Sequence, residues 1–329
     1  MTKILPLDDL PGLASATEAD ASSEFSEIAG GVITIGNFDG VHQGHAMLLG
    51  QVRELADERG CPAVAVVLDP HPVTILRPDL VYRRLTRIER RAALMHEHGI
   101  DALVVCKTTS RFLQLTASEF FDSLVVGCLK ASAMFEGPNF FFGRDRGGDV
   151  AVLQELCDRN GVDLRIVEPT CEGAEMVSST RIRRLLETGN VEKANSMLGH
   201  PYLIRGTVTT GAKRGREIGF PTANLVDMDV VVPAPGVYGG FATVEGMDVA
   251  QVAAIHIGPN PTFEQDGESK VEIHLLGYDG DLYGQQLQVD FVTRVRNIMR
   301  FGSANELIEQ LHKDIQTIRE RLAGGPSRG

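Results

Sequence analysis

The sequence of 329 residues lacks the features of exported, membrane-spanning and zinc-binding proteins. It has no apolar run close to the roughly 20 residues that cross a bilayer. Its first thirty residues have neither a basic start nor an apolar core, so we expect no secretory signal there. Its five cysteines show no Cys-x-x-Cys spacing, which argues against a zinc site and against a disulfide framework. We therefore expect a protein of the reducing cytoplasm.

Clustered basic charge is also scarce. The chain has 32 Lys and Arg residues against 44 Asp and Glu residues, a formal net charge of −12. A general nucleic-acid binder needs groups of basic side chains opposite phosphates, so the charge argues against this class, whereas a nucleotide needs only a few local donors. The hydrophobic fraction of 43% is that of an ordinary globular protein, and the length suggests two domains.

The first half of the chain alternates short apolar runs with stretches of helical spacing. The run 63–68, AVAVVL, is continuous and rich in β-branched residues, as expected of a parallel strand buried on both faces. A Thr116–Glu119 pair has the spacing of a capping box at a helix start. The other expected strands are 32–35, 103–106, 131–135 and 164–167, and the expected helices are 45–59, 88–98 and one that begins at 118. This alternation predicts βαβ units and a doubly wound parallel sheet.

The pattern changes after about residue 200. Five strand-like runs follow one another without intervening helices: 202–209, 236–245, 249–257, 271–278 and 286–292. Such spacing predicts an antiparallel barrel or sandwich, followed by a terminal helix near 304–322. The expected organisation is a flexible segment 1–30, an α/β domain 31–188, a linker 189–201, an all-β domain 202–322 and a disordered tail 323–329.

The densest chemical motif is the segment 36–45, GNFDGVHQGH, directly after the first strand of the α/β half. Its glycines allow close approach of a ligand, and the following helix start offers free N–H groups and a positive dipole end to phosphate. His42 and His45, three residues apart, can then contact phosphates. The alternative is a turn whose histidines only cap the helix. Asp39 could position magnesium or cap the turn. The ligand-binding candidates are Gly36, Asn37, Phe38, Asp39 and Gly40.

A second motif, GAKRGREIGFPTANL, occupies residues 211–225. A glycine-rich basic loop can wrap phosphates through its N–H groups and a cation, although no Walker sequence is present, and a basic hairpin tip is the alternative. Thr222 and Asn224 are two residues apart after a proline, so on an extended strand both side chains share a face. Their oxygens suit a hard cation that carries ATP phosphates.

The first motif resembles the HxGH nucleotidyltransferase superfamily, and within it the FAD synthetase branch of bifunctional riboflavin kinase/FMN adenylyltransferases. Three further segments agree with that branch in order: 69–72 (DPHP), 136–149 (EGPNFFFG and a later GGD) and 178–183 (SSTRIR). The resemblance implies a Rossmann-like domain. It also implies that the FMN phosphate attacks the α-phosphorus of ATP and that pyrophosphate leaves. Such a reaction needs alignment and charge stabilisation rather than a protein nucleophile.

The resemblance implies roles for particular residues. His42 and His45 act on the ATP phosphates, with Ser179, Thr180 and Arg183 on the same group. Asn139 lies near the flavin phosphate or the adenine.

The second motif resembles the riboflavin kinase sequence G-x-x-x-G-R-x-x-G-F-P-T-A-N. The segments 235–238, 260–263 and 271–276 agree with that family in order. The resemblance implies a small six-stranded type of β-barrel that binds riboflavin and Mg-ATP, with Thr222 and Asn224 at the metal. Glu272 matches the carboxylate taken as general base for the ribityl hydroxyl, and His274 is expected to be structural. The ATP- and flavin-binding candidates are Gly211, Lys213, Gly215, Arg216, Gly219, Phe220 and Pro221.

Three positions depart from the kinase pattern. Thr210, Gly277 and Ile298 stand where relatives commonly have His, Asp and Glu. None of them touches the PTAN segment or Glu272. The third departure bears on how the last helix region closes over the flavin.

The resemblance spans roughly residues 31 to 318 and implies a bifunctional enzyme that converts riboflavin to FMN and FMN to FAD. The implied partners are small molecules (riboflavin, FMN and ATP with Mg²⁺) and neither nucleic acid nor membrane. The sequence leaves the oligomeric state open between a monomer and a transient homo-oligomer. Three alternatives stay open: one active half, a flavin-binding regulator without catalysis, and an adenylyltransferase for another nucleotide. The last is disfavoured by the fused PTAN domain.

Overall fold

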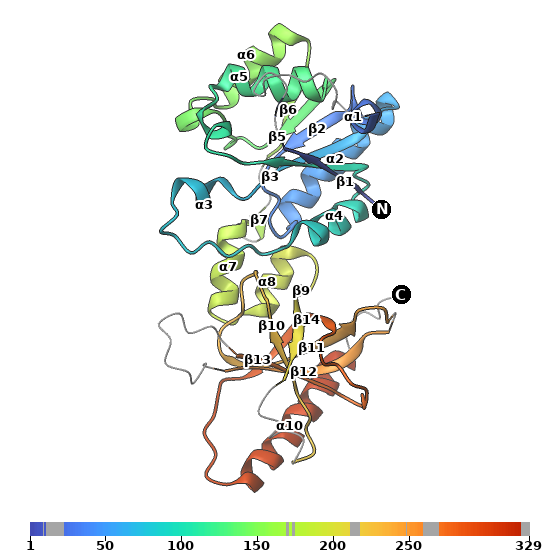
Figure 1. Ribbon diagram of the computed structural model, residues 1–329, viewed down its shortest axis with the longest axis vertical. Helices are drawn as coiled ribbons and strands as arrows, with labels where there is room; N and C mark the ends of the chain where they lie inside the picture. The colour runs from blue at the N-terminus through green and yellow to red at the C-terminus, as the bar shows by residue number, and fades with distance from the viewer. Residues whose placement is uncertain are drawn as a thin grey trace. The chain divides into compact units, whose positions relative to one another are not determined.

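The computed structural model describes residues 1–8, 10, 23–168, 171–172, 175–210, 218–247, 249–258 and 270–323. Packing divides the chain into two units, Met1–Val177 and Ser178–Gly329. Figure 1 shows the first unit in blue to green and the second in yellow-green to red. The division falls earlier than the expected boundary at residue 188, because two helices that follow Val177 pack with the second unit.

The first unit is built on a six-stranded parallel sheet with the strand order β1-β4-β3-β2-β5-β6. This confirms the predicted α/β fold. The strands are β1 (Lys3–Leu7), β2 (Val32–Ile35), β3 (Ala63–Asp69), β4 (Ala102–Lys107), β5 (Ala133–Glu136) and β6 (Asp163–Ile166). The central strands are buried on both faces: every residue of β2 is buried, and so are the first five residues of β3. The strand order reverses between β2 and β5, which is where α/β sheets open a crevice for ligands.

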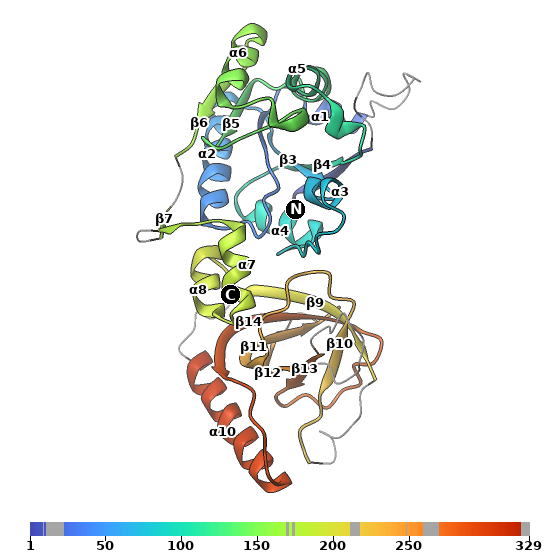
Figure 2. The same cartoon turned by 90° about the vertical axis from the view of Figure 1, so that its left-hand side faces the viewer.

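Helices cover both faces of this sheet (Figure 2). They are α1 (Ser23–Ile28), α2 (Gln43–Arg59), α3 (Pro72–Leu76), α4 (Ile88–Glu97), α5 (Ala117–Phe120) and α6 (Val150–Asn160), with two 3-10 turns, η1 (Phe112–Gln114) and η3 (Arg144–Arg146), and a π-helix, η2 (Phe121–Cys128), directly after α5. Two hydrophobic clusters result, one that includes α2 and α4 residues and one that includes α5, η2 and α6 residues. The expected capping box is present: the Thr116 side chain accepts from Glu119 N, and the Glu119 carboxylate accepts from Thr116 N at 2.8 Å.

The amino terminus corrects one expectation. Residues Lys3–Leu7 were expected to be flexible, but they form β1, which pairs in parallel with β4 from Lys3↔Ala102 to Leu7↔Cys106. Leu5 and Leu7 alternate into the core and are buried. Pro6 lowers the strand propensity of this run, yet it is tolerated here because β1 is the edge strand of the sheet. Residues 9 and 11–22 lie outside the described residues.

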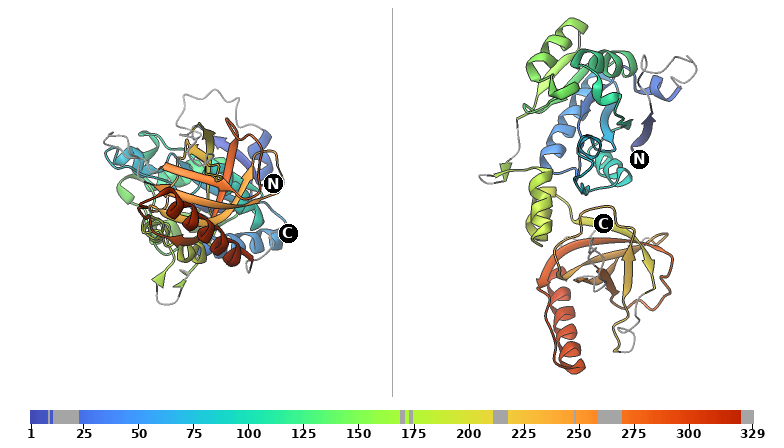
Figure 3. Two further views of the ribbon diagram at one scale, coloured as in Figure 1. Left: turned by 90° about the horizontal axis from the view of Figure 1, so that it is seen from below. Right: turned by 60° about the vertical axis from the view of Figure 1, so that its left-hand side comes forward.

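The second unit contains a closed antiparallel barrel with the order β10-β13-β12-β11-β14-β9, which confirms the predicted six-stranded barrel. Figure 3 shows the barrel with the terminal helix α10 beside it. The strands are β9 (Tyr202–Thr209), β10 (Ala223–Val226), β11 (Gly236–Val244), β12 (Gln251–Gly258), β13 (Lys270–Leu275) and β14 (Gln286–Arg296), and the helices are α7 (Ser179–Glu187), α8 (Val191–Leu198) and α10 (Ala304–Ala323). A two-stranded ribbon, β7 (Cys171–Glu172) and β8 (Glu175–Met176), precedes them. The expected tail lies outside the described residues from 324 onward.

The expected linker 189–201 is instead largely helix, and it is fastened to the barrel. The amide of Asn195 donates to Phe291 O at 2.8 Å. The Glu192 carboxylate accepts from the Thr293 hydroxyl and from Arg294 N at 2.8 and 2.7 Å. The guanidinium of Arg294 donates to Thr188 O at 2.9 Å. The sequence analysis expects a linker here, but the polar groups of this stretch dock α8 on β14.

Candidate active sites

The two histidines of the GNFDGVHQGH segment meet at the amino end of α2. His42 is the N-cap residue, and its Nδ1 accepts from His45 N at 3.3 Å. The two rings stack with centroids 3.6 Å apart, and the Phe38 ring packs on His45 in a T-shaped arrangement with ring centroids 5.1 Å apart. His42 thus does cap the helix, as the alternative interpretation required. The stacked pair also lies where free N–H groups and the helix dipole favour an anion.

Burial keeps both imidazoles neutral. Loss of solvation lowers the pKa of His42 to about 4, and it lowers the pKa of His45 well below its ordinary value, with further lowering from the charges of His42 and Arg91. Within the part of the chain that the structure describes, His45 Nδ1 is buried without a hydrogen-bond partner. A bound phosphate would supply both a partner and a negative charge that favours the protonated rings.

The Asp39 carboxylate holds the turn in place through hydrogen bonds and an ion pair. Its carboxylate accepts hydrogen bonds from Leu85 N at 2.8 Å, from Thr86 N at 3.0 Å and from the Tyr82 hydroxyl at 3.2 Å. It also forms a buried ion pair with Arg91 at 3.0 Å. These partners occupy both oxygens, which favours the turn-holding role of Asp39 over a role in binding magnesium.

Arg91 is a residue that the sequence analysis missed. It is 4% exposed, and its guanidinium donates to Asn37 O at 2.9 Å and to Thr86 O at 3.0 Å, besides pairing with Asp39. Arg91 therefore holds the GNFDG turn in place through the backbone of Asn37 and the carboxylate of Asp39. Its position in the sequence could have revealed it, because Arg91 lies on the buried face of α4, where an apolar residue is expected.

The DPHP segment lies against the same turn, directly after β3 as expected. The Asn37 amide is 2.9 Å from His71 Nε2, and His71 Nδ1 accepts from Val73 N at the start of α3. The His71 ring also contacts Tyr82, with centroids 4.4 Å apart. Over the described residues, Asn37 Oδ1 is buried without a hydrogen-bond partner. An acceptor that faces no protein donor fits a ligand site.

The 136–149 segment divides into exposed and structural residues. Asn139 is exposed beyond the end of β5. Phe142 pairs with Gly148, and a Cβ at Gly148 would lie 2.7 Å from the Phe142 ring. Asp149 caps α6 through Val152 N at 3.0 Å. The GGD part of this motif therefore shapes the loop and starts a helix.

Glu136, at the end of β5, makes a testable contribution to stability. It is 3% exposed, its carboxyl accepts from Ile35 N at 2.7 Å, and burial raises its pKa well above the ordinary value of 4.5. The folded protein holds this proton more tightly than the unfolded chain, so this residue makes the free energy of unfolding fall as the pH rises above about 4.5. The fall is at most about 1.4 kcal/mol per pH unit.

Glu136→Gln keeps the acceptor for Ile35 N and removes the titration. Chemical denaturation at a series of pH values should give equal stabilities for wild type and variant near pH 4.5, and an advantage for the variant that grows with pH. The exposed Glu97→Gln provides the control. Parallel curves for Glu136→Gln and wild type would contradict the prediction.

The SSTRIR segment starts α7. Ser178 is the N-cap residue and accepts from Arg181 N at 3.3 Å, while Ser179, Thr180 and Arg183 occupy the first turns. These three candidate residues belong to the second unit, and the histidine pair belongs to the first. Their joint action on one ATP stays a prediction.

The kinase candidates gather at a cavity of about 370 Å³ on the barrel. Its walls come from β10, β12 and β13, from the end of β14 and from α10. Thr222, Asn224 and Glu272 all line it, and Asn224 lies opposite Glu272 in the β10–β13 pairing. The structure therefore brings the PTAN segment and the expected carboxylate together.

Asn224 has an oxygen suited to a metal ion. Its side chain is 7% exposed, and among the described residues its Oδ1 is buried without a hydrogen-bond partner. A buried acceptor is costly unless it is paired, so a ligand at this oxygen accounts for it. With the nearby Thr222 hydroxyl it forms a set of neutral oxygen donors, which fits a hard divalent cation that also takes phosphate oxygens.

Glu272 has a nitrogen partner at each oxygen. Lys270 Nζ is 2.6 Å from Oε1, and His256 Nδ1 is 3.3 Å from Oε2. The hydrogen bond from His256, followed by that from Lys270, lowers the pKa of Glu272 to about 2 despite partial burial. The carboxylate is therefore ionised throughout the physiological range. The sequence analysis missed both partners: Lys270 is two residues earlier on the same strand, and His256 lies on the neighbouring strand β12.

The remaining kinase residues are placed as follows. Phe220 is buried and contacts the rings of His274 and His312, with centroids 5.6 and 5.2 Å apart. His274 Nδ1 is 2.8 Å from Pro221 O, which supports its expected structural role. Gly219 has a φ of 84°, which glycine adopts without strain. Four candidates (Gly211, Lys213, Gly215 and Arg216) and the segment 260–263 lie outside the described residues.

The departure at Ile298 falls on the cavity wall. Ile298, Met299 and Phe301 line the cavity beside α10 residues, so this wall is apolar. Arg296 forms two hydrogen bonds from Nε and one from Nη2 to the buried Asp314 of α10, at 2.8 to 3.0 Å. The helix is thus fastened to the barrel by Arg296 and not by a carboxylate at position 298.

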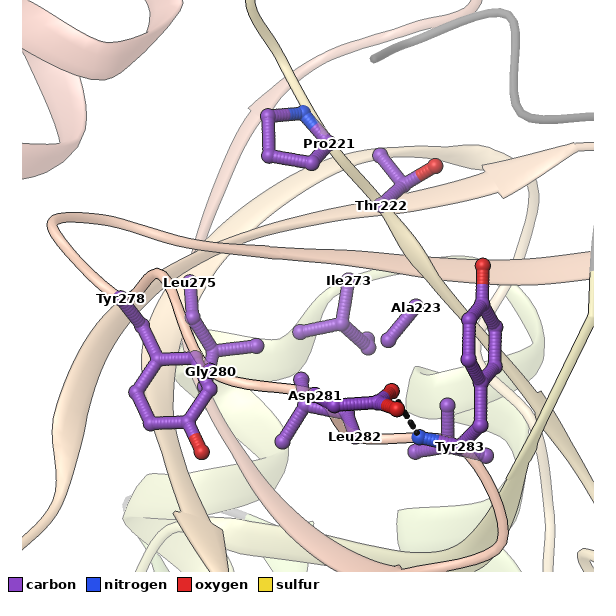
Figure 4. Close-up of a pocket in the computed structure, with 11 residues that line it drawn as sticks. Pro221, Thr222, Ala223, Ile273, Leu275, Tyr278, Gly280, Asp281, Leu282 and Tyr283 are labelled. Carbon is purple, nitrogen blue, oxygen red and sulfur yellow. Dashed lines mark hydrogen bonds between the residues drawn. The ribbon is translucent and has the colours of Figure 1, made fainter.

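A second, smaller cavity of about 80 Å³ shares Thr222 with the first. Figure 4 shows Pro221 and Thr222 above it, and Tyr278 and Tyr283 on either side of Asp281. The Asp281 carboxylate accepts from Tyr283 N at 3.1 Å. The sequence analysis did not single out Asp281 or Tyr283. Their placement beside the PTAN segment shows that Thr222 stands between two recesses.

Comparison with known proteins assigns each unit to a class. The FAD synthetase family model matches residues 25–181, and the riboflavin kinase family model matches residues 198–322. Both families use ATP, generally with a divalent metal.

Similar proteins are named for both of these activities. The bifunctional riboflavin kinase/FMN adenylyltransferase of Escherichia coli strain K12 is 37% identical over 88% of this chain and 92% of its own length. That of Listeria monocytogenes is 34% identical over 89% and 92%. A Streptococcus pneumoniae crystal structure described as a macrolide-efflux protein is 29% identical with a TM-score of 0.84, covering 96% of this chain and 98% of that one. The chain belongs to the family of bifunctional riboflavin kinase/FMN adenylyltransferases. In the described parts of the chain, no helix is long and apolar enough to cross a membrane.

Proposed function

We propose that this chain makes FAD from riboflavin in two ATP-dependent steps, with one step in each unit. The barrel phosphorylates riboflavin to FMN, and the α/β unit transfers an adenylyl group from ATP to FMN and releases pyrophosphate. The observation that carries the proposal is the pairing of Asn224 and Glu272 across β10 and β13 within one cavity, together with the stacked His42 and His45 at a helix start. We place the reactions in the cytoplasm, with small-molecule substrates.

In the kinase step the ribityl hydroxyl oxygen forms a bond to the γ-phosphorus of ATP, and the bond from that phosphorus to the bridging oxygen breaks. Thr222 and Asn224 hold Mg²⁺, which neutralises charge on the phosphates when it is bound. Glu272 is needed for removal of the hydroxyl proton. The apolar wall at Ile298 and Phe301 suits the flavin ring.

In the adenylyl transfer an FMN phosphate oxygen attacks the α-phosphorus of ATP and pyrophosphate leaves. His42 and His45 hold phosphate oxygens and stabilise the charge that develops there. Ser179, Thr180 and Arg183 serve the same phosphates. Asn139 contacts the flavin phosphate or the adenine. Asp39 acts indirectly by holding the turn that carries the histidines.

The experiment is a time course of purified protein with riboflavin, ATP and Mg²⁺, with the flavins separated by chromatography. FMN should appear first and FAD should follow, because the product of the barrel is the substrate of the α/β unit. FMN without FAD, or FAD formed from added FMN while riboflavin is untouched, would leave one active half. Flavin binding without turnover of either substrate would replace the proposal by a flavin-binding regulator.

A further inference from the structure

Two central strands of the first sheet separate before they end. Backbone pairing between β2 and β5 ends at Ile33↔Met134, whereas β5 stays paired with β6 as far as Glu136. In the same register Ile35 would pair with Glu136, but there the Glu136 carboxyl takes the place of the backbone partner and accepts from Ile35 N at 2.7 Å. The Glu136 side chain therefore stands in the opening between the two strands, at the point where the strand order reverses.

One oxygen of this carboxyl is left for a ligand. Glu136 is 3% exposed, and burial raises its pKa well above the ordinary value, which favours the neutral acid with its one proton. Oε1 accepts from Ile35 N, so the proton belongs on Oε2, and within the part of the chain that the structure describes no residue is hydrogen-bonded to Oε2. A buried donor without an acceptor is costly. An acceptor on a bound molecule accounts for it.

The surroundings of Glu136 indicate which part of a ligand reaches it. The next residue leaves open space, because a Cβ at Gly137 would have no atom of the described chain within 4 Å. Across the opening, β2 leads directly into the GNFDG turn and the stacked His42 and His45 at the start of α2, where we place the ATP phosphates. The ribose of ATP is joined directly to the α-phosphate. It is therefore the part of the nucleotide that lies nearest to the strand ends beside this turn.

We propose that Glu136 binds the ribose of ATP in the adenylyl-transfer site: Oε2 donates a hydrogen bond to a ribose hydroxyl while Oε1 keeps its bond to Ile35 N. Acidic side chains recognise ribose hydroxyls in dinucleotide-binding doubly wound folds. A neutral acid binds such a hydroxyl without placing a further negative charge beside the triphosphate. Glu136 is thus a binding residue that selects ribonucleotides, and it takes no part in the chemical step. This inference rests on the proposed adenylyl transfer.

The test compares ATP with 2′-deoxy-ATP and 3′-deoxy-ATP as adenylyl donors to added FMN, with the full chain and Mg²⁺. For the wild type, kcat/KM should be about 10-fold lower with the analogue that lacks the bound hydroxyl, because the Glu136 O–H is then left unpaired. In Glu136→Leu, kcat/KM for ATP should fall and the difference between the nucleotides should disappear. Glu136→Gln keeps an acceptor for Ile35 N and an N–H donor for the ribose, so it should retain the wild-type preference.

Thr2→Val is the matched control. It removes a buried hydrogen bond of the same unit, from Thr2 Oγ1 to Ile100 O at 2.6 Å, at the opposite edge of the sheet. It should lower stability and leave the nucleotide preference unchanged.

The possible results separate this inference from the proposed function. Equal kcat/KM for ATP and both analogues in the wild type would overturn the inference, and this comparison decides even if Glu136→Leu does not fold. A wild-type preference retained in Glu136→Leu would overturn it too. A change confined to the KM for FMN would assign Glu136 to the ribityl chain and refute the ribose contact. A wild type that forms no FAD from FMN and ATP would refute the proposed adenylyl transfer itself.

Discussion

Replacing His42 by asparagine should stop FAD formation and spare FMN formation. Asparagine is a good N-cap residue, so the start of α2 is preserved while the stacked imidazole is lost. Removal of one group that stabilises charge in a transition state typically costs roughly 10²–10³-fold in rate, and we expect that loss for adenylyl transfer. The measurement is FAD formed from added FMN and ATP, alongside FMN formed from riboflavin by the same preparation.

The reciprocal variant completes this test. Glu272→Gln should remove FMN formation and leave adenylyl transfer intact when FMN is supplied, because the two residues lie in different units. If either substitution abolished both activities in a folded protein, the assignment of one reaction to each unit would be wrong.

Replacing Arg91 by methionine should destabilise the first unit by about 3–5 kcal/mol. The substitution leaves Asp39, which is 2% exposed, as a buried carboxylate without its ion-pair partner, and breaking a buried pair on one side costs that much. Lys3→Met is the matched control. Its ion pair with Glu27 is exposed on both sides, and such pairs contribute about 0–1 kcal/mol. The free energy of unfolding, followed by circular dichroism in denaturant, measures both.

Asp39→Asn on the Arg91→Met background should cost less than the sum of the single variants, because it removes the unpaired charge. Adenylyl transfer should fall in Arg91→Met even at temperatures where the unit is folded, since Arg91 also holds Asn37 O in the GNFDG turn. Equal losses of stability in Arg91→Met and Lys3→Met would show that the buried pair has no special role.

The elements that the sequence predicts are those with a strong periodicity of hydrophobic residues. The run AVAVVL at 63–68 is a strand buried on both faces, and the runs after 202 close into a barrel. The strand at Lys3–Leu7 was not foreseen, because five residues that include a proline give little periodicity and their pairing with β4 is set a hundred residues away. Helix α8 was not foreseen for a related reason: its polar residues dock on the barrel, and that contact is tertiary.

The candidate sites divide in the same way. Residues that belong to compact motifs, such as His42, His45, Thr222 and Asn224, were predicted from local spacing. Arg91 and His256 were not, because each contacts a partner distant in the sequence: Asp39 for the first and Glu272 for the second. A buried ion pair or a cross-strand contact has no local sequence pattern, and only the folded chain shows it.

The docking of α7 and α8 on the barrel has a consequence for recombining parts of such proteins. The FAD synthetase family model ends at residue 181, inside α7, whereas the packing boundary follows Val177. A crossover at 181 would divide α7 within its first turn and separate Thr180 from Arg183. A crossover at 177 keeps the helix whole, but it makes Ser179, Thr180 and Arg183 travel with the barrel. An adenylyltransferase module exchanged at the packing boundary would therefore receive the serine, threonine and arginine that we propose to bind phosphate from the kinase of the other parent.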